Sequence, residues 1–183
     1  MAGTIGAIWV SNVEPLGPGS IGFGPQAVHI TTPLPAPNLT SFDVDAFGVS
    51  GMVLEIPARP DMRFTYLVSI RNDGSLPVQV VDAGIGSRTD QVSRHVIAMK
   101  LDLERAGSVE SGFVPFQPFT LAPGGEAGLQ MEVRVSSLAC MAKGGYASWS
   151  SEPVTYRILG LTRHSEVDTG TEIRLIGDGH TGC

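Results

Sequence analysis

The fold class is decided by the stretch Arg63-Phe64-Thr65-Tyr66-Leu67-Val68-Ser69-Ile70-Arg71. Successive side chains of a β-strand point to opposite faces. Aromatic and aliphatic side chains at positions 64, 66, 68 and 70 therefore share one face, and polar side chains at 63, 65, 69 and 71 share the other. Leu67 is the one exception. This alternation predicts a strand with one face in a hydrophobic core and the other in water.

The same two-residue period recurs along the chain. The clearest further example is Leu129-Gln130-Met131-Glu132-Val133-Arg134-Val135. Shorter runs lie at 52–56, 78–80, 97–103, 154–158 and 173–175, with turn sequences such as Asn72-Asp73-Gly74 and Pro123-Gly124-Gly125 between strands. Residues 92–105 also fit a helical stripe, but the alternation from Ile97 onward favours a strand. The chain is therefore predicted to be an all-β protein, an antiparallel immunoglobulin-like β-sandwich of seven to nine strands.

Composition supports this class and excludes others. The 183 residues are 42% hydrophobic and 16% charged, with 23 glycines, 13 prolines and a net charge of −6. A hydrophobic content of this size excludes a disordered chain. A net negative chain without clustered basic residues is not expected to bind nucleic acid.

The N-terminal part differs from the rest in composition. Gly3–Val10 is apolar and uncharged, and it resembles either the outer end of a transmembrane helix or a first β-strand. The segment that follows is rich in glycine and proline, and no positively charged start of a signal peptide is present. We therefore expect residues 1–37 to be a membrane-proximal apolar segment and linker, and residues 38–183 to be the sandwich.

The cysteine content bears on the cellular compartment. Cys140 and Cys183 are the two cysteines of the chain. An isolated pair is typical of a single disulfide in an oxidising compartment, although two free thiols in the cytosol are the alternative. Pairing would also hold the terminal Cys183 in place.

Two local patterns resemble a known class of domain. One is the strand, Asn-x-Gly turn and Pro-Val strand over Ser69–Val80, and the other is the Phe-x-Leu-x-Pro-Gly element over Phe119–Gly124. Together they resemble the immunoglobulin-like or fibronectin type III-like domains of bacterial surface and membrane-anchored proteins. The chain as a whole is similar to uncharacterised extracytoplasmic domains of actinobacteria. It departs from antibody-type domains because its cysteines lie late in the chain.

Two groups of residues are candidate sites. Tyr146 and Trp149 offer large contact area for a binding surface, although Trp149 is equally compatible with a buried position. His164, Glu166 and Asp168 fall on one side of a strand and form a candidate metal row, although a solvent-exposed polar row explains them as well. No catalytic motif of a serine hydrolase, phosphate-binding loop or zinc protease is present.

The expected function follows from these observations. We expect a non-enzymatic interaction or structural module outside the cytoplasm, without a cofactor. Its expected partner is a protein at the cell surface, and its link to a membrane is an N-terminal transmembrane helix outside this sequence. The alternatives are a protein that binds a divalent metal or a small ligand through the His/Glu/Asp row, and a hydrolase with a dispersed catalytic site.

Overall fold

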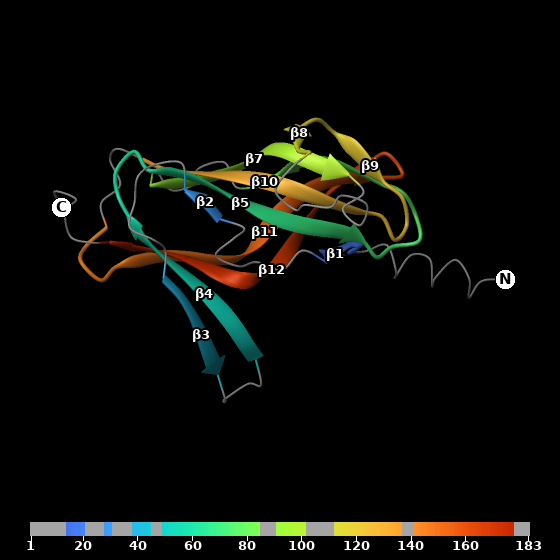
Figure 1. The fold of residues 1–183 in the computed structure, drawn as a ribbon. Coiled ribbons are helices and arrows are strands. Elements are labelled where there is room, and N and C mark those ends of the chain that lie inside the picture. The colour runs from blue at the N-terminus through green and yellow to red at the C-terminus, as the bar shows by residue number, and fades with distance from the viewer. Residues whose placement is uncertain are drawn as a thin grey trace.

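The computed structural model describes residues 14–20, 28–30, 38–44, 49–84, 91–101, 112–136 and 141–177. These residues form strands, turns and loops, and none of them is helical. They build two β-sheets that face each other across one hydrophobic core (Figure 1). No helix in the described ranges is long and apolar enough to cross a membrane. The protein is thus an all-β sandwich, as the alternation predicts.

The first sheet is antiparallel and has six strands. Its main path runs β1-β5-β10-β7-β8, and β2 also pairs with β5. The bounds are β1 Leu16–Pro18, β2 Val28–Ile30, β5 Arg63–Asn72, β7 Val92–Leu101, β8 Val114–Pro115 and β10 Glu126–Val135.

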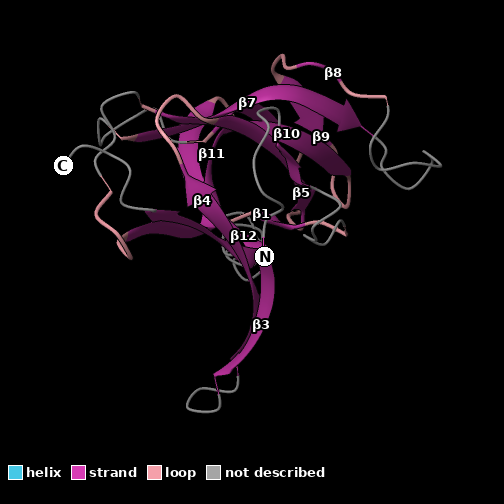
Figure 2. Cartoon of the chain, turned by 60° about the vertical axis from the view of Figure 1, so that its left-hand side comes forward, coloured by secondary structure: helices cyan, strands magenta, loops and turns pink. Residues whose placement is uncertain are grey.

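The second sheet also has six strands, in the order β3-β4-β12-β11-β6-β9. The bounds are β3 Asn38–Val44, β4 Val49–Ala58, β6 Val78–Ala83, β9 Phe119–Leu121, β11 Tyr146–Ile158 and β12 Leu161–Gly177. Strands β4 and β12 pair in parallel, whereas the other pairs are antiparallel. The first residues of β4 pair with β3 alone, so the β3–β4 hairpin projects beyond the rest of the sheet (Figure 2).

The core lies between the two sheets. Strand β5 contributes Phe64, Tyr66, Val68 and Ile70, each no more than 1% exposed, which confirms the predicted inner face. The facing sheet contributes buried apolar residues of β4, β6, β11 and β12, such as Ile173. Full burial of one such side chain stabilises the fold by roughly 1.5–3 kcal/mol.

The structure differs from the simple alternation at two strands. In β5, Thr65 and Ser69 are buried along with Leu67, so this strand is covered on both faces. Gly19 contributes to this cover, because a Cβ added there would lie 2.7 Å from Ser69 Oγ. In β7, the register shifts opposite Gln130 and Met131, so Val96 and Met99 are buried. The predicted inward run from Ile97 is therefore confirmed at Met99 but wrong at Leu101, which is 44% exposed.

The number of strands and their pairing also differ from the prediction. The described residues form twelve strands rather than seven to nine, and one pair is parallel. Several of the additional strands are short, and their two or three residues cannot show a period. Leu16–Pro18 and Val28–Ile30, which belong to the predicted linker, pair with β5 and are part of the sandwich. Residues 3–10 lie outside the described ranges.

The two turn motifs identified in the sequence, Asn72-Asp73-Gly74 and Pro123-Gly124-Gly125, lie against each other. The Asn72 backbone N–H donates to Gly125 O at 2.9 Å, and the Gly124 N–H donates to Asn72 O at 2.8 Å. The Asn72 side chain is fully buried and donates to Leu76 O and Leu121 O, at 2.9 and 3.0 Å. Asn72 therefore connects the β5–β6 turn with β9 and with the turn before β10.

Cys140 and Cys183 lie outside the described ranges, and their pairing stays a prediction. The described residues next to them are close together. The Gly177 N–H donates to Gly145 O at 2.8 Å, and a Cβ on Gly177 would lie 2.7 Å from Met141 Cβ. Cys183 follows Gly177 by six positions, which span at most roughly 20 Å.

The disulfide is tested by the mass of the protein made under oxidising conditions. We expect the intact protein to be lighter by two hydrogens than the reduced protein. We also expect reduction to lower the free energy of unfolding by about 4 kcal/mol, because a loop of this length loses its closure. The Cys183→Ser variant is the control, since its stability should not depend on reductant. Two free thiols in the oxidised preparation contradict the prediction.

Candidate functional site

A cluster of polar side chains is buried between the two sheets. Tyr66 from β5 and Arg94 from β7 belong to the first sheet, and Glu152 from β11 belongs to the second. Glu152 Oε1 accepts hydrogen bonds from the Tyr66 hydroxyl and from Arg94 Nη1, the latter at 2.6 Å. Arg94 Nη1 also donates to Ser151 O at 3.2 Å. The cluster therefore joins the two layers through charge-assisted hydrogen bonds.

Local strand geometry directs these residues inward. Glu152 has the same parity as Val154, Tyr156 and Ile158, which are buried, so it faces the core. Trp149 has the opposite parity, but the pairing of β11 with β12 shifts between Trp149 and Ser151. An irregularity of this kind changes which residues face inward. Because of the shift, Trp149 and Glu152 both face the interior.

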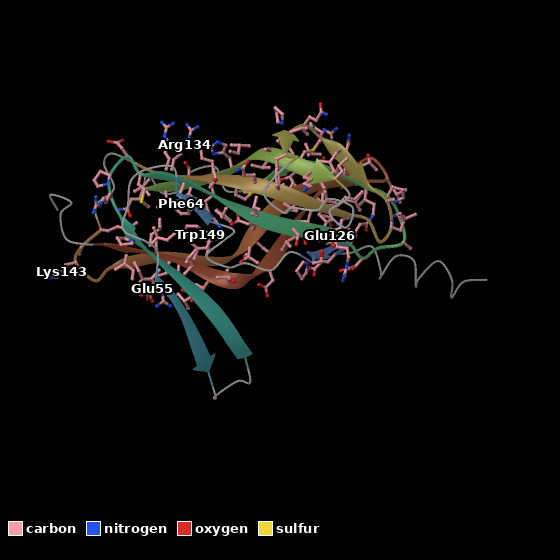
Figure 3. The ribbon with its side chains drawn as sticks, viewed as in Figure 1. Glu55, Phe64, Glu126, Arg134, Lys143 and Trp149 are labelled. Carbon is pink, nitrogen blue, oxygen red and sulfur yellow. The ribbon has the colours of Figure 1, made fainter. Side chains whose placement is uncertain are left out.

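Trp149 covers the cluster. Its Nε1–H donates to the Tyr66 hydroxyl at 3.3 Å, and its ring centroid lies 4.7 Å from Arg94 Cζ. An arginine over a tryptophan face gains a cation–π attraction, which strengthens as water is excluded. Figure 3 shows Trp149 between the layers, with Arg134 and Glu55 on the outer faces. Trp149 is thus a half-buried part of the interior.

Burial controls the acid–base properties of the cluster. It raises the pKa of Glu152 from 4.5 to about 7, against the opposing effects of Arg94 and the Tyr66 hydrogen bond. Burial also raises the pKa of Tyr66, and the nearby Glu152 adds to that rise. Glu152 Oε2 is buried without a hydrogen-bond partner in the described part of the chain. Tyr66 and Glu152 are 0% and 1% exposed, so a dissolved substrate cannot reach this acid.

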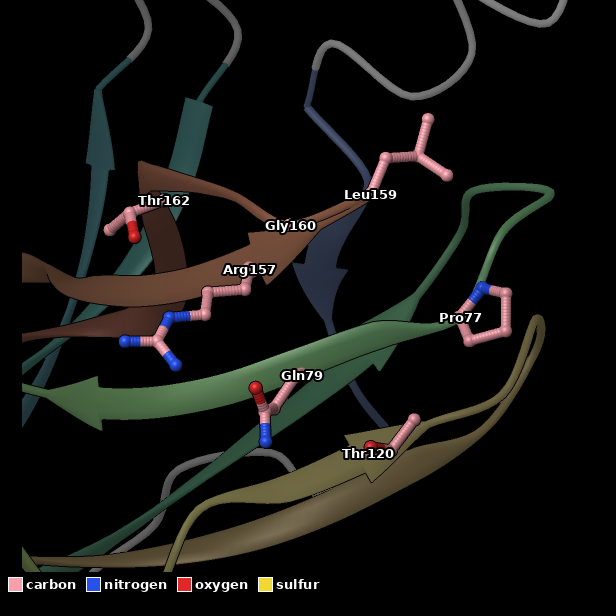
Figure 4. A pocket seen from close by; sticks show the side chains of 7 residues that line it. All are labelled: Pro77, Gln79, Thr120, Arg157, Leu159, Gly160 and Thr162. Carbon is pink, nitrogen blue, oxygen red and sulfur yellow. The ribbon is translucent and has the colours of Figure 1, made fainter.

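An open pocket of about 660 Å³ lies on the other side of the second sheet (Figure 4). Its lining comes from β6, β9, β11 and β12 and from the turns at their ends, and consists of Pro77, Gln79, Thr120, Arg157, Leu159, Gly160 and Thr162. The pocket is therefore a surface feature, separated from the buried cluster by the sheet.

The predicted binding pair Tyr146 and Trp149 does not form one surface. Tyr146 is 65% exposed on the outer face of β11, where Arg174 Cζ lies 5.0 Å from its ring centroid. Trp149 points to the opposite face and packs on the core. Arg174 itself is paired with Glu172 at 3.0 Å. Tyr146 remains available as an exposed aromatic side chain, whereas Trp149 has a packing role.

The predicted metal residues His164, Glu166 and Asp168 alternate along β12 and are exposed. Each has its own neighbour. His164 Nδ1 lies 3.0 Å from Thr155 Oγ1, Glu166 Oε2 accepts from Ser151 Oγ at 2.8 Å, and Asp168 Oδ1 accepts from Gly170 N–H at 2.8 Å. Within the described ranges, no three His, Cys, Asp or Glu side chains gather closely enough to hold a metal ion.

The sequence reasoning missed Arg94 and Glu152. A signal for both was present, because each shares the parity of buried neighbours: Val96 for Arg94, and Val154 for Glu152. An opposite-charge pair at inward positions of two strands predicts a buried ion pair, since an isolated buried charge is too costly.

Comparisons with known proteins find only distant structural similarities to this chain. No protein-family model and no curated protein matches the chain. Among solved structures, it is similar to the VesB protease of Vibrio cholerae, with 14% identity over 68% of this chain and 30% of that one, at a TM-score of 0.35. A family 123 glycoside hydrolase from Clostridium perfringens matches with 12% identity over 68% and 23% of the two chains, at a TM-score of 0.34.

A third similar structure is a PapD-like domain of human CEP192, with 7% identity over 87% of this chain and 97% of that one, at a TM-score of 0.31. The chain spans less than a third of the length of the protease and of the glycoside hydrolase. At these TM-scores the likeness carries no argument about activity.

The ion pair can be tested by removing one partner. We expect Arg94→Met to lower the free energy of unfolding at pH 8 by about 3–5 kcal/mol, because the Glu152 carboxylate loses its buried counter-charge. Adding Glu152→Gln should recover part of this loss, since the amide oxygen still accepts from Tyr66. The matched control is Arg134→Met, which removes an arginine whose side chain is 46% exposed and should cost at most about 1 kcal/mol. Equal losses for the two arginines, measured by urea unfolding, contradict a stabilising role for the pair.

The raised pKa of Glu152 predicts a pH dependence of stability. Between pH 4.5 and 7 the folded protein holds a proton on Glu152 that the unfolded chain has released. Stability from this group is therefore present below pH 4.5 and is lost as the pH rises toward 7, by about 3 kcal/mol in total. Urea unfolding across this range should show the decline in the wild type and not in Glu152→Gln. Superimposable pH profiles of the two proteins would rule the assignment out.

Proposed function

We propose that this chain is a non-enzymatic interaction or structural module that works outside the cytoplasm as part of a membrane-anchored protein. The observation that carries the non-enzymatic part is the position of Glu152. It is the described carboxylate whose pKa is shifted to near neutrality, and it is 1% exposed and hydrogen-bonded on its Oε1. A general acid must reach its substrate, so this arrangement supports a structural role for Glu152.

The architecture supports an interaction role. A sandwich is a rigid frame that presents hairpins and outer sheet faces to solvent. Here the outer face of the second sheet holds the open polar pocket, and it also presents the exposed ring of Tyr146. Both features offer contact area without catalytic groups placed around a bond.

The extracytoplasmic part of the proposal is supported by the sequence. The apolar stretch Gly3–Val10 and the pair Cys140 and Cys183 are its two grounds. Neither ground lies within the described residues.

Location is tested on the full-length protein in its own cells. We expect a tag placed after the sandwich to be removed by protease added to intact cells, while a cytosolic marker stays intact. Cleavage of the tag only after lysis would contradict an extracytoplasmic position.

Two measurements on the purified protein distinguish the alternative functions. A chelator-sensitive rise in melting temperature on adding calcium, zinc or manganese would favour metal binding by the His164 row. Labelling by a serine-hydrolase probe would favour an enzyme. We expect neither response.

A further inference from the structure

A row of polar side chains crosses four strands inside the open pocket. Thr120 of β9 pairs with Gln79 of β6, Gln79 pairs with Arg157 of β11, and Arg157 pairs with Thr162 of β12. All four line the pocket, and Figure 4 shows them on the same side of the sheet. Three steps between strands of about 4.8 Å each make the row about 14 Å long, which matches four or five residues of extended peptide. The side chains offer a guanidinium, an amide and two hydroxyls.

Arg157 makes no ion pair with any described residue. Arg71, Arg94, Arg134 and Arg174 each contact a carboxylate. Arg157 is exposed, and the residues that line the pocket with it include no acid. Its fork of N–H donors matches a carboxylate in two-point geometry. The pocket therefore holds a positive charge without a counter-charge among its lining residues.

Leu159 forms the apolar part of the pocket and is unusual in both its backbone conformation and its exposure. It lies in the turn between β11 and β12 at a φ of 51°, followed by Gly160 at a φ of 80°. Two-residue turns of this kind favour asparagine followed by glycine, because a bulky residue at positive φ is strained. Leu159 is also 82% exposed, although an apolar side chain gains nothing from exposure. Strained residues of this kind cluster where ligands bind.

The polar and apolar parts of the pocket are adjacent. Leu159 follows Arg157 by two positions, and Pro77 precedes Gln79 by two positions on the neighbouring antiparallel strand. Leu159 and Pro77 therefore lie on the same side of the row, next to the guanidinium and the amide (Figure 4). A ligand that fills the pocket therefore contacts a cation and an adjacent apolar surface.

We propose that this pocket binds an extended acidic peptide segment of a protein partner. A carboxylate of the segment contacts Arg157, an adjacent apolar side chain packs on Leu159 and Pro77, and Gln79, Thr120 and Thr162 provide further hydrogen bonds. This inference rests on the proposed interaction function and names its partner chemistry. An anionic membrane fits less well, because attraction to a charged lipid surface relies on clustered basic residues, and Arg157 is the one basic residue among those that line the pocket.

The first test uses nuclear magnetic resonance with defined probes. The probes are two blocked pentapeptides, Ala-Glu-Leu-Ala-Ala and Ala-Leu-Glu-Ala-Ala, and their counterparts with glutamine in place of glutamate. We expect the glutamate peptides to shift the Arg157 Nε–H, the Gln79 amide and the backbone signals of 120 and 162, and the glutamine peptides to bind at least about tenfold more weakly. Arg157→Gln should weaken binding by a similar factor, while the control Arg134→Gln should not change it. Absence of these shifts, or equal binding of both kinds of peptide, overturns the proposal.

A second variant separates binding from folding. We expect Leu159→Asn to raise the melting temperature by about 2 °C, because asparagine tolerates the positive φ. The same variant should weaken the glutamate peptides at least threefold, because the apolar contact is lost. Unchanged peptide affinity, or a lowered melting temperature, would show that Leu159 is not held in this conformation for binding.

The outcomes also separate this site from the proposed function. If the peptides fail to bind while the tag is accessible on intact cells, the site is wrong and the interaction module stands. If the tag is protected in intact cells while the peptides bind at Arg157, the site stands and the location is wrong. If phosphatidylglycerol vesicles bind in a way that depends on Arg157 while the peptides do not bind, the peptide proposal is wrong and the pocket binds a membrane surface.

Discussion

The ion pair between Arg94 and Glu152 is the constraint on which the arrangement of the two sheets depends. A carboxylate and a guanidinium taken out of water each lose several kcal/mol of solvation. The loss is reduced only if the two sheets hold the charges at hydrogen-bonding distance, here 2.6 Å. Other relative positions of the sheets leave at least one buried charge unpaired. The pair therefore restricts how one sheet can slide over the other, which hydrophobic packing alone restricts much less.

The shift in β11 belongs to the same constraint. Without it, Trp149 and Glu152 would face opposite sides of the strand. With it, the tryptophan ring covers the arginine that the carboxylate binds, and its N–H completes the hydrogen bonding of Tyr66. The irregular stretch thus lets β11 supply both Glu152, which pairs with Arg94, and Trp149, which covers Arg94. At the other end of the sandwich, Asn72 has a comparable role with neutral groups, because it satisfies the backbone carbonyls of two separate segments.

Sequence reasoning reached the fold class because alternation is a local property. Each inward residue of β5 and β10 is identified by its immediate neighbours, without knowledge of the partner strand. It failed where the period is interrupted. The shift opposite Met131 places both Val96 and Met99 on the inner face of β7, and no turn residue marks that place. The parallel pairing of β4 with β12 is likewise decided by distant residues.

The candidate sites likewise combine features that local sequence predicts with features that depend on distant residues. His164, Glu166 and Asp168 do share an exposed face, since that follows from parity, but convergence on one ion would require residues from other strands. Arg94 and Glu152 are harder to find, because charged residues usually face water. The row at Arg157 depends on the register of four strands, which local sequence does not specify. The turn sequence Leu159-Gly160 is a local signal for the pocket that the predicted sites do not include.

The position of β12 has a consequence for the order in which the chain folds. This strand lies between β4 and β11, and Met52 pairs with Thr171 across most of the chain. Until β12 leaves the ribosome, β4 and β11 each present an unpaired edge, and the second sheet cannot close over the core. Folding that depends on such distant pairings is slow, and open edges invite pairing with other chains. The nascent protein therefore remains dependent on protection from aggregation until its last described strand has been made.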